Sequence, residues 1–102
     1  MGGMPARLVV TRAGLPDRRV PLYEGAPLVV GRGMDAGVSV PDEEALSRRH
    51  AVVRLQAGAV RVERLPEAQG PVYVDGVAKD AFELAAGGQF LIGRTRFTFE
   101  TG

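Results

Sequence analysis

Apolar residues in this chain fall in short segments, and in several of these segments they alternate with polar residues. Residues 59–65 show the pattern well, because Val60 and Val62 alternate with the charged Arg61 and Glu63. A period of two is typical of a β-strand with one buried face. No segment longer than about five residues repeats with the 3.6-residue period of an α-helix. The pattern therefore predicts an all-β protein.

Turn-forming residues divide the chain into these short strands. The pair Asp75-Gly76 is a strong signal for a two-residue hairpin turn. Pro21 places its strand at a sheet edge, because proline cannot donate to a ladder. Many short strands separated by turns indicate a β-sandwich or a barrel. Strands are expected at residues 6–11, 18–23, 28–31, 38–40, 50–55, 59–65, 72–74, 77–79, 82–84, 89–93 and 96–100.

The composition is that of one ordinary globular domain. The chain has 102 residues, 45% hydrophobic and 25% charged, and we expect a single domain over residues 1–102. Residues 1–5 are expected to be disordered or derived from cloning, and they do not begin a signal peptide. The net charge of +1 argues against a nucleic-acid partner, and no apolar run approaches the roughly 20 residues that cross a bilayer. We therefore expect a cytoplasmic domain without a membrane partner.

The residue types present argue against metal and cofactor sites. The chain has no cysteine and one histidine, which excludes disulfides, thiolate ligands and multi-histidine sites. Asp42, Glu43 and Glu44 form an acidic run, expected to make a single helical turn over residues 42–45 with solvated carboxylates. No pair of carboxylates is placed for catalysis. The sequence therefore predicts no metal, no cofactor and no catalytic residue.

Two short motifs carry the candidate chemistry of the chain. Gly31-Arg32 ends one apolar run, and Ser47-Arg48-Arg49-His50 leads into the next. Because each motif lies where a strand meets a loop, the arginine and serine side chains can converge on one anion. Guanidinium groups bind phosphate oxygens in pairs, and a serine hydroxyl adds a short donor. The spacing therefore predicts a phosphate-binding site.

The two motifs in register resemble the forkhead-associated (FHA) family, whose members bind phosphothreonine peptides. The resemblance extends from about residue 28 to residue 99 and includes Val72-Tyr73-Val74-Asp75-Gly76 and Phe90-Leu91-Ile92-Gly93. It implies an antiparallel β-sandwich of about eleven short strands (FHA/SMAD-like), with ligand loops at one end. It also implies a phosphothreonine-dependent protein–protein interaction module in Ser/Thr-kinase signalling or complex assembly, rather than an enzyme. The implied partner is a phosphothreonine-containing protein or peptide, with a Ser/Thr kinase or its substrate among the candidates.

The resemblance also implies roles for single residues. Arg32 and Ser47 match the two residues that contact the phosphate. Arg48 matches a position that often contributes a further phosphate or peptide contact. Gly31 matches the glycine that lets the backbone turn at the strand end, and His50 matches a histidine that supports the binding loops without touching the ligand.

One stretch of the chain departs from the family pattern. Family members carry Asn-Gly-Thr, a two-residue step and then Asn-Gly, and the first asparagine holds the main chain of the ligand. Here Gly70 replaces that asparagine and Val72 replaces the threonine. Asp75 replaces the second asparagine before Gly76, a mild change because both residue types suit a hairpin turn. Phosphate capture is therefore expected to persist, whereas the peptide contact at position 70 is weakened.

Alternative functions follow from the same residues. The first is a scaffold of the same fold that binds its partner without phosphate, which Gly70 and Val72 favour. The second is a serine hydrolase with His50 as base for Ser47, which is disfavoured because no third group is evident to orient the histidine. Ser47 alone could also be a turn residue bonded to its own loop. Arg49 is expected to be a plain surface charge, since adjacent residues of an extended chain point to opposite faces.

Overall fold

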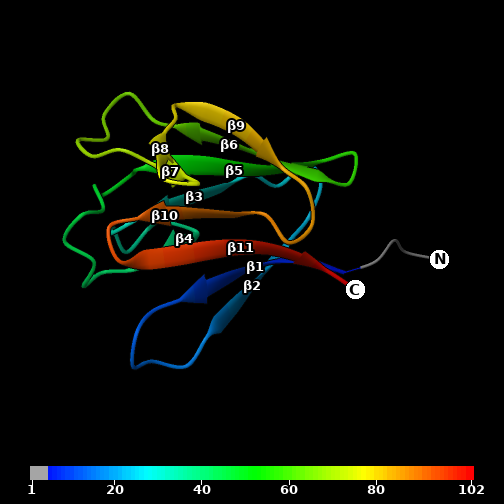
Figure 1. The fold of residues 1–102 in the computed structure, drawn as a ribbon, viewed down its shortest axis with the longest axis horizontal. Coiled ribbons are helices and arrows are strands. Elements are labelled where there is room, and N and C mark those ends of the chain that lie inside the picture. The colour runs from blue at the N-terminus through cyan, green and yellow to red at the C-terminus, as the bar shows by residue number, and fades with distance from the viewer. Residues whose placement is uncertain (1–4) are drawn as a thin grey trace.

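A computed structural model of the protein describes residues 5–102. The expectation for residues 1–5 therefore lies outside the described residues, except at Pro5, which is exposed. Within this range the chain forms eleven β-strands in two sheets and no helix, so it has no helix that could span a membrane (Figure 1). The predicted all-β sandwich of about eleven strands is confirmed.

The first sheet contains six antiparallel strands in the order β2-β1-β11-β10-β7-β8. Its strands are β1 (Ala6–Thr11), β2 (Arg18–Leu22), β7 (Tyr73–Val74), β8 (Val77–Ala78), β10 (Gln89–Ile92) and β11 (Thr95–Thr101). Strand β2 lies at the edge, as Pro21 predicts. The β1–β11 ladder runs from the pair Ala6 and Thr101 to the pair Thr11 and Arg96. It therefore joins the two ends of the described chain in the middle of one sheet.

The second sheet contains five strands in the order β4-β3-β5-β6-β9. Its strands are β3 (Leu28–Gly31), β4 (Val38–Ser39), β5 (Ala51–Gln56), β6 (Ala59–Arg64) and β9 (Ala81–Leu84). Among the paired strands of residues 5–102, only β3 and β4 run parallel. The pairing is parallel because a turn at residues 33–36 carries the chain around before it rejoins β3 at Val38.

Two hairpin turns fix the register of their strands. Ala57 and Gly58 both have positive φ angles, of 51° and 81°, and so do Asp75 and Gly76, with 51° and 79°. Two consecutive positive φ angles match the right-handed twist of the flanking strands, which is why such turns join hairpins closely. The turn predicted at Asp75-Gly76 is confirmed. Strand β5 begins and ends one residue later than the strand expected at residues 50–55.

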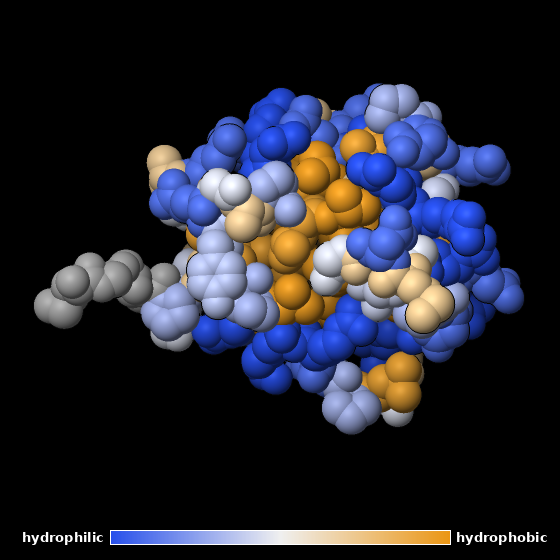
Figure 2. Space-filling view, turned by 180° about the vertical axis from the view of Figure 1, so that it is seen from behind, coloured by the Kyte–Doolittle hydropathy of each residue, from blue (hydrophilic) through white to orange (hydrophobic). Residues whose placement is uncertain are grey.

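Apolar side chains of both sheets interdigitate in one core. Phe90 stacks on Phe97 with ring centroids 4.8 Å apart and meets Phe82 edge-on at 5.7 Å. Fully burying a side chain of this size contributes roughly 1.5–3 kcal/mol. On the outer face of the second sheet the half-buried Val29 and Val52 pair across β3 and β5. Figure 2 shows an apolar band on the side of the molecule seen from behind, with hydrophilic residues around it. The core supports the loops at both ends of the sandwich.

The loops gather at the two ends of the strands. The β3–β4, β4–β5, β6–β7 and β10–β11 connections lie together at the left of Figure 1, and the two ends of the described chain lie at the right. Both sequence motifs with candidate chemistry belong to the left-hand loops. The fold therefore brings these motifs to one end of the sandwich.

Candidate functional site

Backbone hydrogen bonds join the end of β3 to the loop that precedes β5. The amide of Arg32 donates to the carbonyl of Ser47 at 2.9 Å, and that of Gly33 donates to the carbonyl of Arg48 at 3.1 Å. The amide of His50 donates to the carbonyl of Val30 at 2.9 Å. The two sequence motifs therefore lie side by side, although residues 33–46, which include strand β4, separate them along the chain.

Gly31 makes this close approach possible. A Cβ atom built at position 31 would overlap the carbonyl group of Arg48 and lie 3.1 Å from the Cα atom of Arg49. Gly31 does not have a positive φ angle, so its role is not the freedom to turn that the sequence suggested. The position requires glycine because any side chain would push the two loops apart.

The loops enclose an open groove of about 520 Å³. The three residues expected to contact phosphate, Arg32, Ser47 and Arg48, all line it. Both arginines are exposed, and Ser47 is half-buried. The complete lining consists of Arg32, Glu44, Ala45, Leu46, Ser47, Arg48, Arg49, Glu67 and Gln69. The structure thus brings the predicted phosphate contacts into one place.

Arg49 also lines the groove, so its expected role as a plain surface charge is incomplete. The expectation assumed an extended chain, whereas Arg48 and Arg49 lie in a bend, where neighbouring side chains do not alternate between two faces. Arg49 Nε lies 3.9 Å from an Oε atom of Glu67, with about half of each side chain exposed. Exposed pairs of this kind contribute little to stability.

Ser47 connects the two loops that form the groove. Its hydroxyl oxygen accepts a hydrogen bond from the amide of Gln69 at 2.9 Å, and its own amide donates to Nδ1 of His50 at 3.0 Å. The Ser47 hydroxyl is therefore bonded to a different loop rather than to its own. Its hydrogen remains able to donate to an anion in the groove.

His50 is fully buried behind the groove. Because Nδ1 accepts a hydrogen bond, the ring proton is on Nε2, which has no hydrogen-bond partner among the described residues. Burial lowers the pKa of His50, although the nearby carbonyls of Pro71 and Gly70 oppose the shift. The ring is therefore neutral at pH 7. It lies where the resemblance expects a histidine that supports the loops.

Arg64 holds the β6–β7 loop in place, a contact that the sequence analysis missed. Its Nε donates to the carbonyl of Gly70 at 2.8 Å, and its Nη2 donates to that of Ala68 at 3.0 Å. A signal was available in the sequence. The period of two puts Arg64 on the same face of β6 as the buried Val60 and Val62, so its side chain turns inward.

The residues of the departing stretch lie outside the groove. Gly70 lines a neighbouring depression with Arg64 and Lys79, and Gln69 lines both this depression and the groove. A Cβ atom at position 70 would lie 3.3 Å from the carbonyl oxygen of Ala45. The amide side chain at the groove is therefore that of Gln69, one position before the family asparagine.

Val72 and the hairpin after it are structural. Val72 is fully buried, so its side chain cannot reach a ligand in the groove. Asp75 and Gly76 form the β7–β8 turn and do not line the groove. The structure thus places Gly31 and His50 against the groove and leaves Asp75 and Gly76 to the hairpin.

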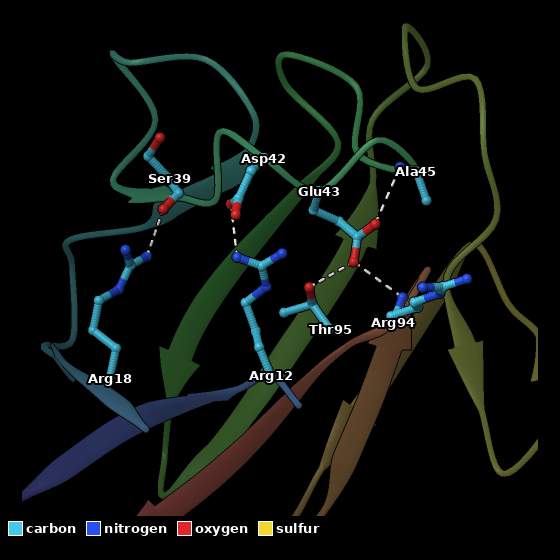
Figure 3. Close-up of polar contacts among 8 residues, drawn as sticks. All are labelled: Arg12, Arg18, Ser39, Asp42, Glu43, Ala45, Arg94 and Thr95. Carbon is cyan, nitrogen blue, oxygen red and sulfur yellow. Dashed lines mark hydrogen bonds and ion pairs between the residues drawn. The ribbon is translucent and has the colours of Figure 1, made fainter. Parts of the chain in front are cut away.

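The acidic run contains a buried carboxylate, which corrects the expectation that all three acids are solvated. Glu43 is only 7% exposed. Its carboxylate accepts hydrogen bonds from Oγ1 of Thr95 at 2.7 Å, the amide of Arg94 at 3.0 Å and the amide of Ala45 at 3.3 Å (Figure 3). Burial raises the pKa of Glu43, but these hydrogen bonds outweigh it and hold the pKa below its usual value. Glu43 therefore stays ionised and ties the β4–β5 loop to the β10–β11 turn.

The expected helical turn at residues 42–45 is also wrong, because the bonds of Glu43 to the β10–β11 turn hold this segment in another conformation. The amide of Glu43 donates to the carbonyl of Val40 at 3.2 Å, and the amide of Leu46 donates to the carbonyl of Glu43 at 3.1 Å. Two successive turns therefore meet at Glu43. Figure 3 shows the neighbouring bond from Nη1 of Arg12 to Asp42, 2.6 Å long, which lowers the pKa of Asp42. Contacts with distant strands, rather than local helix formation, determine this segment.

Comparison with known proteins gives matches among solved structures alone. No protein-family model matches the chain, and no curated protein is similar to it at a significant level. The FHA domain of the CT664 protein from Chlamydia trachomatis is 23% identical, with a TM-score of 0.84 over 94% of this chain and 96% of that one. The FhaA FHA domain, complexed with the intracellular domain of Rv3910, is 23% identical, with a TM-score of 0.76 over 93% of this chain and 99% of that one.

A third similar structure is Mycobacterium tuberculosis EmbR in complex with a low affinity phosphopeptide. It is 27% identical, with a TM-score of 0.77 over 94% of this chain but 24% of the EmbR chain. These structures align with nearly all of the chain described above. The similarity in sequence to the FHA family thus has its counterpart in three dimensions, and the chain has the fold of a forkhead-associated domain.

Proposed function

We propose that this domain is an interaction module that binds proteins or peptides carrying phosphothreonine, in Ser/Thr-kinase signalling or in complex assembly. The observation that carries the proposal is the meeting of Arg32, Ser47 and Arg48 at one groove. Two similar structures support it, since EmbR is in complex with a low affinity phosphopeptide and the FhaA FHA domain with an intracellular domain of another protein. A Ser/Thr kinase or its substrate is the kind of partner we propose.

The charges of the groove suit a phosphate dianion. Among residues 5–102, neither Arg32 nor Arg48 has a carboxylate within 4.0 Å, whereas Arg12 is paired at 2.6 Å. Two unpaired guanidinium groups and the Ser47 hydroxyl offer several donors to the phosphate oxygens. Because the backbone around Arg32 is bonded to the loop of Ser47, the backbone segments that carry these donors are held in place before the ligand arrives.

The main chain of the ligand needs a second holding point. We propose that the Gln69 amide supplies part of it, because this side chain lines the groove while Gly70 lies beside it without a side chain. An amide offers both a donor and an acceptor to a peptide backbone. Gly70 lies next to Gln69 and keeps a contact with the main chain of the ligand in this proposal, through its backbone alone.

A catalytic role for Ser47 and His50 has little support. The histidine accepts from the backbone amide of Ser47 and not from its hydroxyl, and the hydroxyl oxygen is bonded to Gln69. A serine nucleophile requires its hydroxyl to donate to the base. We therefore propose a binding function without catalysis. A cytoplasmic location belongs to the same proposal, because phosphothreonine is made where Ser/Thr kinases act. The proposal includes neither nucleic acid nor a membrane as partner.

The second candidate function is a scaffold that binds its partner without phosphate. The burial of Val72 and the lack of a side chain at Gly70 favour it, because neither residue can contact a ligand as its family counterpart does. A screen of phosphothreonine peptides with unphosphorylated copies distinguishes the two functions. The proposed function expects binding that requires the phosphate. Equal binding of both copies would establish the scaffold instead.

A further inference from the structure

The groove that holds the three phosphate donors also has acidic walls. Glu44 and Glu67 line it, one from each of the two loops. Glu44 is exposed and has no cationic side chain within 4.0 Å among residues 5–102. Glu67 meets Arg49 only at 3.9 Å. The groove therefore carries both signs of charge, because Glu44 and Glu67 line it together with Arg32, Arg48 and Arg49.

The groove is larger than a phosphate group requires. A phosphate has five heavy atoms, and if each takes about the 30 Å³ of a water molecule, the group fills roughly 150 Å³. The groove measures about 520 Å³, so most of it remains for the residues that flank the phosphothreonine. Flanking residues that enter the groove share it with Glu44 and Glu67, which belong to its lining.

The backbone at Glu44 is held in position by its neighbours, while its side chain is exposed. The adjacent Glu43 is fixed by three hydrogen bonds, and the next residue, Ala45, donates one of them. A charge on a rigid turn loses little conformational entropy when it pairs with a ligand. An anion next to a phosphate site also repels the phosphate, and a cation on the same ligand removes this repulsion.

We propose that the groove selects phosphothreonine peptides that carry a lysine or arginine close to the phosphothreonine, with Glu44 as the main partner of that cation and Glu67 as the second. This inference rests on the proposed function. Exposed ion pairs are worth about 0.2–1 kcal/mol, so a basic flank binds up to about fivefold tighter than a neutral one. An acidic flank binds more weakly than a neutral one.

The test is a calorimetric titration of phosphothreonine peptides with alanine flanks. One lysine, or one glutamate, replaces alanine at each position within about three residues of the phosphothreonine. The wild type should rank lysine above alanine above glutamate at one or more positions, and the differences should shrink at high salt because exposed charges are screened. Equal affinities for the three flanks at every position would overturn the inference.

Charge reversal identifies the residue responsible. In Glu44→Lys the ranking should invert, so that the glutamate peptide binds tighter than the lysine peptide, and Glu67→Lys should show a smaller change of the same sign. The matched control is Glu24→Lys, an exposed acid in the β2–β3 connection that does not line the groove. It should keep the wild-type ranking. An unchanged ranking in both Glu44→Lys and Glu67→Lys would also overturn the inference.

The unphosphorylated peptides separate this inference from the proposed function. If phosphorylation never improves binding, whatever the flank, the proposed function is wrong and the inference falls with it. If phosphorylation is required but the flank has no effect, the inference alone is wrong.

Discussion

The two loops that meet at the groove differ in how much ligand-binding chemistry they carry. The β4–β5 loop contributes Ser47 and Arg48, next to Arg32 at the end of β3, and its backbone is bonded at several points. The β6–β7 loop contributes only the amide of Gln69 and the carboxylate of Glu67. Under the proposed function, the difference separates the capture of a phosphate from the holding of a peptide main chain, and the first can persist while the second is reduced.

The largest expected effect comes from the phosphate side. Arg32→Ala should weaken binding of a phosphothreonine peptide by about 2–4 kcal/mol, or roughly thirty- to nearly a thousandfold, because one partner of a charge-assisted pair is lost. Arg32→Lys should also weaken binding, since an ammonium lacks the planar fork. Wild-type affinity should decline below about pH 6 as the phosphate dianion takes up a proton and becomes a monoanion. Calorimetry measures all three effects.

Arg19→Ala is the control for this prediction. Arg19 is exposed on the edge strand β2, does not line the groove, and should have no effect on affinity. Equal affinity of wild type and Arg32→Ala for a confirmed ligand would remove Arg32 from the phosphate site.

The next effect concerns the support of the β4–β5 loop. Glu43→Gln should destabilise the fold by about 1–3 kcal/mol. The carboxylate of Glu43 accepts three hydrogen bonds, and the NH2 group of a glutamine would face at least one of these donors with a second donor. Thermal unfolding measures the change. Glu44→Gln, one residue away and exposed, should stay within about 0.5 kcal/mol of the wild type. Similar melting temperatures for the two variants would mean that the buried carboxylate does not hold the loop.

His50, which lies behind the groove, makes the free energy of unfolding depend on pH. Its pKa is lowered in the folded protein, so the unfolded chain binds the proton more readily. The stabilisation is complete above the ordinary pKa of 6.5 and is lost as pH falls from there through the lowered pKa. The slope cannot exceed about 1.4 kcal/mol per pH unit for one proton.

Denaturant unfolding of the wild type between about pH 7.5 and pH 5 measures this slope. His50→Asn, which cannot titrate, should lose that part of the slope even though it is less stable throughout. Parallel curves for wild type and variant in this range would show that His50 does not titrate as proposed. Glu43 and Asp42 have lowered pKa values and act only at lower pH.

The smallest expected effect comes from the β6–β7 loop and tests how much this loop contributes to peptide binding. Gly70→Asn should tighten binding of a phosphothreonine peptide by about 1 kcal/mol, the worth of one neutral hydrogen bond, or about fivefold. The gain is limited because the new side chain starts 3.3 Å from the carbonyl oxygen of Ala45. Gln69→Ala should weaken binding by a similar factor. If the wild type binds tightly and neither variant changes the affinity, the loop holds its partner in another way.

Local patterns were sufficient to predict most of the fold. The bounds of strands β1 and β3 are those that the sequence pattern predicts, and the hairpin turn lies at Asp75-Gly76, as the preference of these residues for positive φ angles predicts. The meeting of Arg32 with Ser47 was predictable because both residues lie at strand ends. These features depend on short-range periodicity and on turn geometry, which a single sequence displays.

The remaining features depend on contacts that the sequence does not display. Glu43 looked like a solvated acid because its partner Thr95 lies in a distant strand, and nothing local marks it as buried. Arg49 was expected to be a plain surface charge because the bend before β5 was treated as extended chain. The steric role of Gly31 depends on the backbone of Arg48, which approaches only after the loops have folded.

The amide of Gly102 donates to the carbonyl of Pro5 at 3.0 Å, beyond the last pair of the β1–β11 ladder. The two ends of the described chain are therefore neighbours, and they lie at the end of the sandwich opposite the β3–β4, β4–β5 and β6–β7 loops (Figure 1). A tag, a sensor surface or a second protein attached through either end leaves the groove facing solvent. A short linker could also join these ends, with new termini opened at the exposed Ala57-Gly58 turn, so the domain is a suitable scaffold for circular permutation.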